Sequence, residues 1–293
     1  MMINQFLNYL RYERNASPQT VQTYEENLRE FESYLSFRDE GLSLDRVDTD
    51  LIRDWMEGLM DKGNNASTIN KKLSALRSFY RFALKRKLVI ADPAHPITGP
   101  KKSKPLPQFL RENEMDHLLD QIEWGNNYKD VRARTILILF YEAGLRRSEL
   151  TGLNDDDVDF NTRQLKVTGK RNKQRIIPFG EELSLMLGRY IALRDEQFGT
   201  DGGALFLNDK GERMTGSQVY TIVHKYLTAV TSLKKRSPHV LRHTFATAML
   251  NNGAGLESIK NLLGHESVST TEIYAHTTFE QLKRIYKEAH PRA

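Results

Sequence analysis

Apolar residues recur at helical spacing through most of the first ninety positions. After Ser17 and Pro18, apolar side chains return every three or four residues from Val21 to Leu35. Serine is a favoured N-cap and proline a favoured first helical residue, so this stretch predicts a helix that begins at Pro18.

Two more helices are predicted before the pattern breaks. One runs from about Val47 to Met60, and the next follows Ser67 as its expected cap. Residues 92–109 then hold five prolines, one glycine and three lysines, a composition that cannot continue a helix and keeps a chain extended. We therefore predict an all-helical domain over residues 1–92 and a linker over residues 93–109.

Residues 110–293 mix helical and strand-like patterns. We expect a helix over Glu112–Gln121 and a buried helix that contains the longest apolar run, Ile136–Tyr141, and ends at Gly144. Turn residues at 161, 162 and 169 separate short predicted strands. Later helices are expected over Glu182–Arg194, Gly216–Thr231, His239–Asn251 and Leu256–Leu263. The predicted fold class is mainly α with a small β-sheet, the second domain being α/β.

Composition narrows the function classes. Hydrophobic residues make up 39% of the 293 positions and charged residues 28%, as in a globular protein. The longest apolar run is far shorter than the ~20 residues that cross a bilayer. There is no cysteine, which excludes a disulfide framework and a thiolate metal site. No secretory signal is visible, so a cytoplasmic, nucleoid-associated location is expected.

Positive charge is concentrated rather than spread evenly. The net charge is +5, yet residues 1–100 carry fourteen basic and fourteen acidic residues. From Lys62 to Ala91 there are eight basic residues and no acidic one. A polyanion partner and an ordinary solvated basic face both fit this charge pattern.

One face of the third predicted helix favours the polyanion. Opposite its apolar stripe, cations alternate with small hydroxyl side chains, which leaves room for close approach to a phosphate backbone. The DNA-binding candidates on this helix are Lys71, Arg77, Arg81 and Lys85.

Four stretches of the second domain hold residues suited to chemistry. They are "EAGLRRSEL", with Arg146; "TGKRNKQR", with Lys170; "SPHVLRHTFAT", with His239 and Arg242 on one helix face; and "LLGHESVSTTEIYAH", with His265 and Tyr274. Taken one at a time, each has an ordinary structural explanation. An arginine after a helix often binds its terminal carbonyls, and a lysine in a β-turn is usually solvated.

Metal and nucleotide sites are less well supported. His239 and His243 are four apart, but no glutamate lies between them and Arg242 would repel a cation. The "TGKR" stretch lacks the first glycine and the final hydroxyl residue of a P-loop. We therefore expect no cofactor and no metal.

Taken together, the stretches "GLR", "GK", "HVLR", "LGH" and "IY" resemble the tyrosine recombinases of the phage-integrase family over essentially the whole chain. The block around Tyr274 and the ending "YKEAHPRA" look most like the Xer subgroup. Two positions differ from that subgroup: Arg171 stands where glycine is common, and Arg147 follows the first arginine.

The resemblance implies a site-specific DNA recombinase, independent of metal and ATP, shaped as a C-shaped clamp on DNA. Tyr274 would attack a phosphodiester to give a 3′-phosphotyrosine, and Arg146 and Arg242 would hold the phosphate. Lys170 would protonate the leaving 5′-oxygen, His239 would transfer a proton to or from the tyrosine, and His265 would bind the phosphate.

The resemblance also implies partners. Four protomers, identical or of two kinds, would act on two duplexes, with the segment after Tyr274 docking on a neighbour; a second Xer-type recombinase and a septal DNA translocase are further expected partners. Chromosome-dimer resolution at cell division is the expected role. Alternatives are a transposon or phage integrase, a type IB topoisomerase-like nicking enzyme, and a helical DNA-binding regulator without catalysis.

Overall fold

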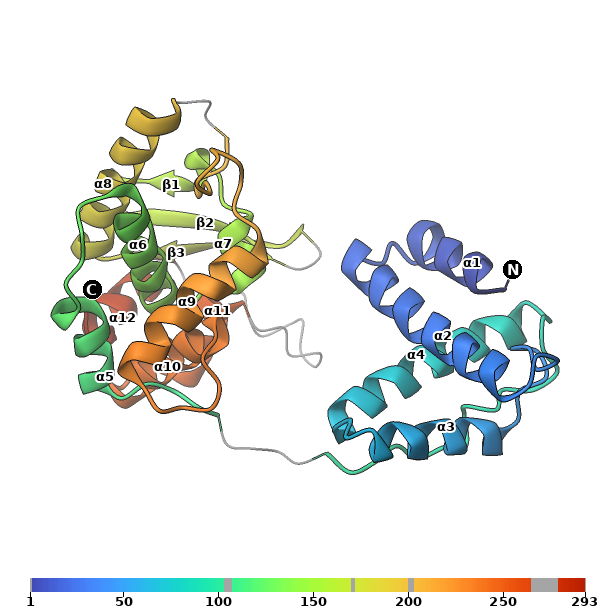
Figure 1. Cartoon of the computed structure of the whole chain (residues 1–293). Helices are drawn as coiled ribbons and strands as arrows, with labels where there is room; N and C mark the ends of the chain where they lie inside the picture. Colours follow the sequence, from blue (N-terminus) through green and yellow to red (C-terminus); the bar gives the residue numbers. More distant parts are fainter. Residues whose placement is uncertain (1, 103–106, 170–171, 200–202, 265–278, 293) are drawn as a thin grey trace. The chain divides into compact units, whose positions relative to one another are not determined.

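The computed structural model describes residues 2–102, 107–169, 172–199, 203–264 and 279–292 (Figure 1). Lys170, His265 and Tyr274 lie outside the described residues. The chain divides into two compact units, Met1–Pro105 and Leu106–Ala293.

The first unit is helical, as predicted. Its elements are α1 (Met2–Asn8), the π-helical turn η1 (Tyr9–Glu13), α2 (Pro18–Arg38), α3 (Thr49–Asp61) and α4 (Ala66–Lys85). The Ser17 cap is confirmed, because its Oγ accepts a hydrogen bond from the Thr20 N–H at 3.3 Å. The predicted Ser67 cap is wrong: Asn65 accepts from the Thr68 N–H at 2.9 Å, so α4 has already begun when the chain reaches Ser67.

Aromatic packing holds these helices together. Phe6 of α1 meets Phe79 of α4 edge to face, with ring centroids 5.7 Å apart, and Phe31 of α2 lies 4.8 Å from Trp55 of α3. Large buried rings of this kind dominate the stability of a small core. The chain after α4 joins the same core through Ala94 and Ile97, so the proline-rich stretch begins as a packed segment. Because the apolar face of α4 is buried in this core, its opposite, basic face is exposed to solvent.

The second unit surrounds one buried helix. Its elements are α5 (Glu112–Asp116), η2 (His117–Gln121, π-helical), α6 (Tyr128–Ala143), α7 (Arg147–Thr151), η3 (Asp155–Asp157, a 3₁₀ turn), β1 (Val158–Asp159), β2 (Gln164–Thr168), β3 (Gln174–Pro178), α8 (Glu181–Phe198), α9 (Gly216–Val230), α10 (Pro238–Asn251), α11 (Leu256–Leu263) and α12 (Phe279–Ala289). The helix α6 packs against α8 and α10. The strands form an antiparallel sheet in the order β1-β2-β3, with Leu165 opposite Ile177 and Val167 opposite Arg175. The mainly helical fold with a small sheet is confirmed.

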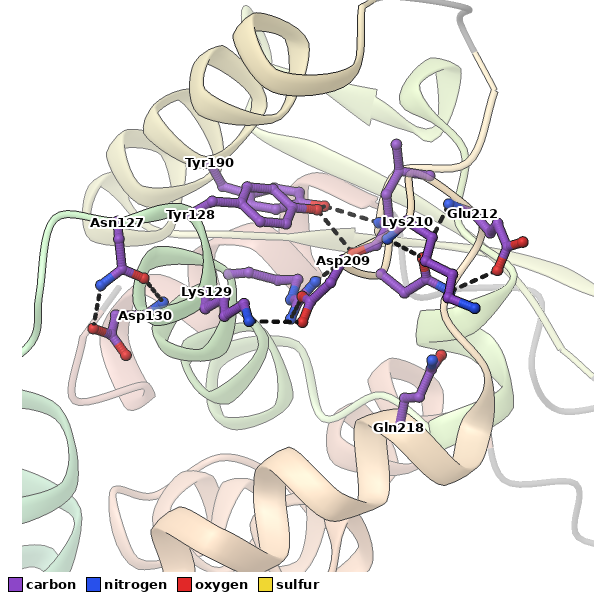
Figure 2. A network of polar contacts seen from close by, with 12 residues as sticks. Asn127, Tyr128, Lys129, Asp130, Tyr190, Asp209, Lys210, Glu212 and Gln218 are labelled. Carbon is purple, nitrogen blue, oxygen red and sulfur yellow. Dashed lines mark hydrogen bonds and ion pairs between the residues drawn. The ribbon is translucent and has the colours of Figure 1, made fainter.

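A polar network fixes the segment that leads into α9. The Leu207 carbonyl accepts hydrogen bonds from Tyr128 Oη and Arg132 Nη1, both at 2.8 Å, and the Leu207 N–H donates to Tyr190 Oη at 3.0 Å. Arg132 also pairs with Asp209 at 2.8 Å. Figure 2 shows this network, with Tyr128 of α6, Tyr190 of α8 and Asp209 of the chain before α9 labelled.

The last helix, α12, packs on the unit's own core beside β3, α10 and α11. Tyr286 is buried and its hydroxyl donates to Glu142 Oε2 at 3.2 Å, while the Gly180 N–H donates to the same oxygen at 3.0 Å. His290 lies 3.2 Å from the Tyr141 carbonyl. Among the described residues, no helix is both long and apolar enough to cross a membrane.

Candidate active site

The end of α6 delivers Arg146. Gly144 ends that helix in the left-handed region, with φ of 56°, and a Cβ there would lie 2.6 Å from Phe245 Cδ1. The chain therefore turns sharply in a place where only glycine fits. Arg146 becomes the N-cap of α7, where its backbone N–H donates to Glu149 Oε2 at 2.8 Å and its Nη1 to Glu149 Oε1 at 2.6 Å.

Arg242 reaches the same place from α10. Its Nη1 donates to the Gly144 carbonyl at 2.6 Å and its Nη2 to the Leu263 carbonyl at 2.7 Å. The distance from its Nη1 to Glu149 Oε2 is 3.9 Å. Burial, with the nearby charge of Arg146, lowers the pKa of Arg242 to about 10, so it stays protonated at neutral pH. The two predicted arginines thus meet around one carboxylate.

Both arginines also bind helix ends, which is the ordinary structural role considered from the sequence. Arg146 Nη2 donates to the Gly264 carbonyl at 2.9 Å. Gly264 ends α11 at φ of 63° and precedes His265 in the chain. A guanidinium carries five N–H donors, so a carbonyl contact and a phosphate contact are compatible in one side chain.

Sequence reasoning missed two residues of this site, Glu149 and Arg175. Arg175 lies on β3 and donates from Nη1 and Nη2 to the two Glu149 oxygens, both at 2.9 Å. Burial acts to raise the pKa of Glu149, but hydrogen bonds and charge from Arg175, then hydrogen bonds from Arg146, outweigh it and lower the pKa to about 2. Glu149 is thus a buried anion at neutral pH.

Charge in this cluster is unbalanced toward the positive. Among the described residues, three guanidinium groups (Arg146, Arg175 and Arg242) surround one carboxylate (Glu149), which gives these four groups a net charge of +2, from 3 − 1. Because Arg175 and Arg242 are largely buried, water compensates their charge poorly. Because Arg175 pairs with both Glu149 oxygens, Arg146 and Arg242 are the groups suited to an incoming anion with two or more acceptor oxygens, such as a phosphodiester.

His239 stands in the first turn of α10, after Ser237 at the N-cap and Pro238 at the first helical position. The Ser237 side chain makes no capping hydrogen bond. Partial burial, followed by the charges of Arg242, His243, Arg147 and Arg146, lowers the pKa of His239. A neutral imidazole can accept a proton.

The DNA-binding candidates on α4 divide into two groups. Lys71, Arg81 and Lys85 are exposed. Arg77 is half-buried and donates to the carbonyls of Ala94 and Ile97. Within the part of the chain that the structure describes, no three His, Asp or Glu side chains gather in a way that could hold a metal ion.

Known protein families and relatives match both units of the chain. The phage integrase family matches residues 108–281, and the phage integrase N-terminal SAM-like domain matches residues 3–87. Tyrosine recombinase XerC from Pelotomaculum thermopropionicum is 36% identical over 99% of this chain and 98% of that protein. XerC from Halalkalibacterium halodurans is 38% identical over 99% of this chain and 97% of its own length.

Solved structures share the fold. XerH recombinase bound to its difH substrate in a pre-cleavage complex has a TM-score of 0.70 at 23% identity, covering 96% of this chain and 83% of that one. The Tn1549 transposon integrase in complex with transposon right end DNA also has a TM-score of 0.70 at 23% identity, covering 98% of each chain. With both sequence models matched along the chain, this protein belongs to the phage integrase family of tyrosine recombinases.

Proposed function

We propose that this chain cuts and rejoins DNA strands through a covalent 3′-phosphotyrosine on Tyr274. The observation that supports this most is that Arg146 and Arg242 meet beside one buried carboxylate whose two oxygens Arg175 already pairs, which leaves positive charge on Arg146 and Arg242 for a phosphate. Preorganised charge of this kind acts on the transition state, and removing one such group typically costs ~3 kcal/mol.

The proposed step conserves atoms and protons. The Tyr274 hydroxyl oxygen bonds to phosphorus, and the bond from phosphorus to the 5′-oxygen breaks. Lys170 gives a proton to that oxygen, and His239 takes the proton of the phenol, whose ordinary pKa of ~10 makes it a poor nucleophile without help. Arg146 and Arg242 neutralise the charge on the non-bridging oxygens, with His265 as a further hydrogen-bond donor. The reverse reaction, with a different 5′-hydroxyl, completes strand exchange.

A nicked suicide substrate tests the chemistry. After cleavage its short 5′-fragment diffuses away, so we expect wild-type protein to leave a covalent adduct that survives denaturant. Tyr274→Phe should form no adduct and bind the same DNA with unchanged affinity. An adduct from the Phe variant would show that another residue is the nucleophile. No adduct from wild type would favour a regulator that only binds DNA.

For the biological role, we propose chromosome-dimer resolution together with a second recombinase of the same kind, in the cytoplasm. The supporting observation is similarity along almost the full length to curated relatives named XerC. The DNA recovered from covalent adducts in cells tests this role. A single chromosomal site is expected, whereas the ends of mobile elements would mean integration or transposition.

A further inference from the structure

We propose that Arg175 is a positioning residue for strand cleavage: it anchors the β2–β3 hairpin, which leads into Lys170, to Glu149 and to the end of α11, and proton donation by Lys170 depends on that anchor. This inference rests on the proposed function, in which Lys170 protonates the leaving oxygen. Arg175 itself touches neither the phosphate nor the reacting atoms in this proposal.

The contacts of Arg175 are directional and shielded from water. Its side chain is 13% exposed. Two N–H groups donate to the two oxygens of Glu149 at 2.9 Å, and Nε donates to the Leu262 carbonyl at 2.8 Å. One planar group therefore ties a strand to α7 and to α11 at once. A lysine at this position could not reproduce that pattern, because an ammonium lacks the rigid fork of donors.

The place of Arg175 in the hairpin explains why such an anchor is useful. The β2–β3 ladder ends at the pair Thr168 and Gln174, next to Arg175, and the Gly169 N–H donates to the Lys173 carbonyl at 2.7 Å. Lys170 follows Gly169 directly in the chain. Since β1 pairs with β2 only at Gln164 and Leu165, the described sheet continues beyond them as two strands, and a two-stranded ribbon is only marginally stable without tertiary contacts such as those of Arg175.

Glycine at the end of α11 keeps the tie short. A Cβ on Gly264 would lie 3.1 Å from Arg175 Nη1 and 3.2 Å from its Cδ. The Arg175 guanidinium therefore packs against the backbone of Gly264, where a side chain would crowd it. The carbonyl of the same glycine accepts a hydrogen bond from Arg146 Nη2. Arg175 and Arg146 both bind Glu149, and both donate to carbonyls at the end of α11. These contacts connect the β2–β3 hairpin to α7 and to α11. A proton donor misplaced by about 1 Å can cost ~10²-fold in rate.

The experiment compares two leaving groups. Single-turnover cleavage is measured on the suicide substrate with its ordinary 5′-oxygen and on the same DNA with sulfur at that bridging position. A thiol has a pKa of about 8.5, so the sulfur leaves readily as a thiolate without a proton donor. An alkoxide is a much stronger base and needs a proton in order to leave. Loss of a correctly placed Lys170 should therefore slow the oxygen substrate far more than the sulfur substrate, and Lys170→Ala calibrates the effect.

We expect Arg175→Gln to cleave the oxygen substrate ~10²-fold more slowly and the sulfur substrate within about threefold of wild type. Its affinity for DNA should stay within about twofold. Arg189→Gln, an exposed arginine on α8, is the matched control and should cleave both substrates at wild-type rates. In a Lys170→Ala background, Arg175→Gln should slow the oxygen substrate no further.

An equal loss on both substrates would overturn the proposal, because the defect would then lie in phosphate binding. A full additional loss in the Lys170→Ala background would overturn it too, as would a wild-type rate from Arg175→Lys. If thermal unfolding shows that Arg175→Gln does not fold, the same comparison is made with Arg175→Lys. Failure of the proposed function is distinct, since wild type would then form no adduct with either substrate.

Discussion

Replacing Glu142 by glutamine should remove a pH dependence of stability that the buried carboxyl creates. Glu142 lies on α6 and is fully buried. Its Oε2 accepts hydrogen bonds from Gly180 and Tyr286, while its Oε1 has no partner among the described residues. Burial raises the pKa of Glu142 to about 8, against the smaller lowering effect of the Gly180 N–H. At pH 7 the group is mostly neutral, and glutamine copies its shape and charge.

The sign follows from where the proton is bound. Between the ordinary pKa of 4.5 and about 8, the folded protein holds a proton that the unfolded chain releases. The stability contribution is full below pH 4.5 and is lost as the pH rises through 8. His290 acts in the opposite direction: burial lowers its pKa from 6.5 to about 4, so it adds stability as the pH rises between those values. Above pH 6.5, Glu142 alone of these two groups titrates.

The size of this loss of stability follows from the pH range in which, of Glu142 and His290, only Glu142 titrates, pH 6.5 to about 8. One pH unit corresponds to ~1.4 kcal/mol for one proton, so a change from pH 6.5 to 8 costs the wild type about 2 kcal/mol. For a unit of this size, each kcal/mol moves Tm by ~2–4 °C, which predicts a fall of roughly 4–8 °C.

Calorimetry at pH 6.5 and 8, at one ionic strength and without DNA, measures this slope. Glu142→Gln should show little change in Tm between the two pH values, whatever its absolute stability. Glu181→Gln, an exposed carboxylate at the start of α8, is the control and should keep the wild-type slope. The reasoning is refuted if Glu142→Gln loses as much stability between the two pH values as the wild type does.

Three further changes test other parts of the structure. Glu149→Gln removes the only carboxylate shown among three guanidinium groups in the described site, and should lower the free energy of unfolding in urea titrations by ~3–5 kcal/mol; a loss below 1 kcal/mol would contradict the charge account. Gly144→Ala should lower the free energy of unfolding by ~2–4 kcal/mol, because of the positive φ and the clash with Phe245. Gly188→Ala, on α8 with open space around it, should raise that free energy by up to ~1 kcal/mol. Equal effects of the two substitutions would contradict the close packing at Gly144. Arg81→Ala should reduce the salt slope of DNA binding by ~1, while Arg77→Ala should lower Tm and leave that slope unchanged; the reverse result would place Arg77 on the DNA.

Local signals predicted the helices well because each signal acts within one turn. The helix over Leu256–Leu263 was predicted with its observed bounds, since Gly264 ends it. The cap of α4 was misplaced because Asn65 and Ser67 are both good capping residues, and sequence alone does not rank two candidates so close together. Arg77 is a DNA-binding candidate from its place on a basic helix, and local spacing gives no sign of its hydrogen bonds to carbonyls 17 and 20 residues along the chain. These hydrogen bonds become apparent only once the structure shows Ala94 and Ile97 packed on the core.

The two missed site residues left traces in the sequence. Glu149 stands three residues after Arg146, the spacing of a capping box at the start of a helix. Arg175 shares a strand face with buried Ile177, so a charge at that inward position called for a buried partner. The partner is 26 residues away in the chain, and spacing cannot identify a contact over that distance.

The surplus positive charge around Glu149 also sets how stable the protein is without DNA. Mutual repulsion among three arginines is a cost that the free enzyme carries, and a bound phosphate would relieve it. By linkage, any anion that occupies the cluster only in the folded state raises the melting temperature of the second unit. We therefore expect the DNA-free protein to melt at a lower temperature than the anion-bound protein, a compromise between stability and binding that is common at sites for charged substrates.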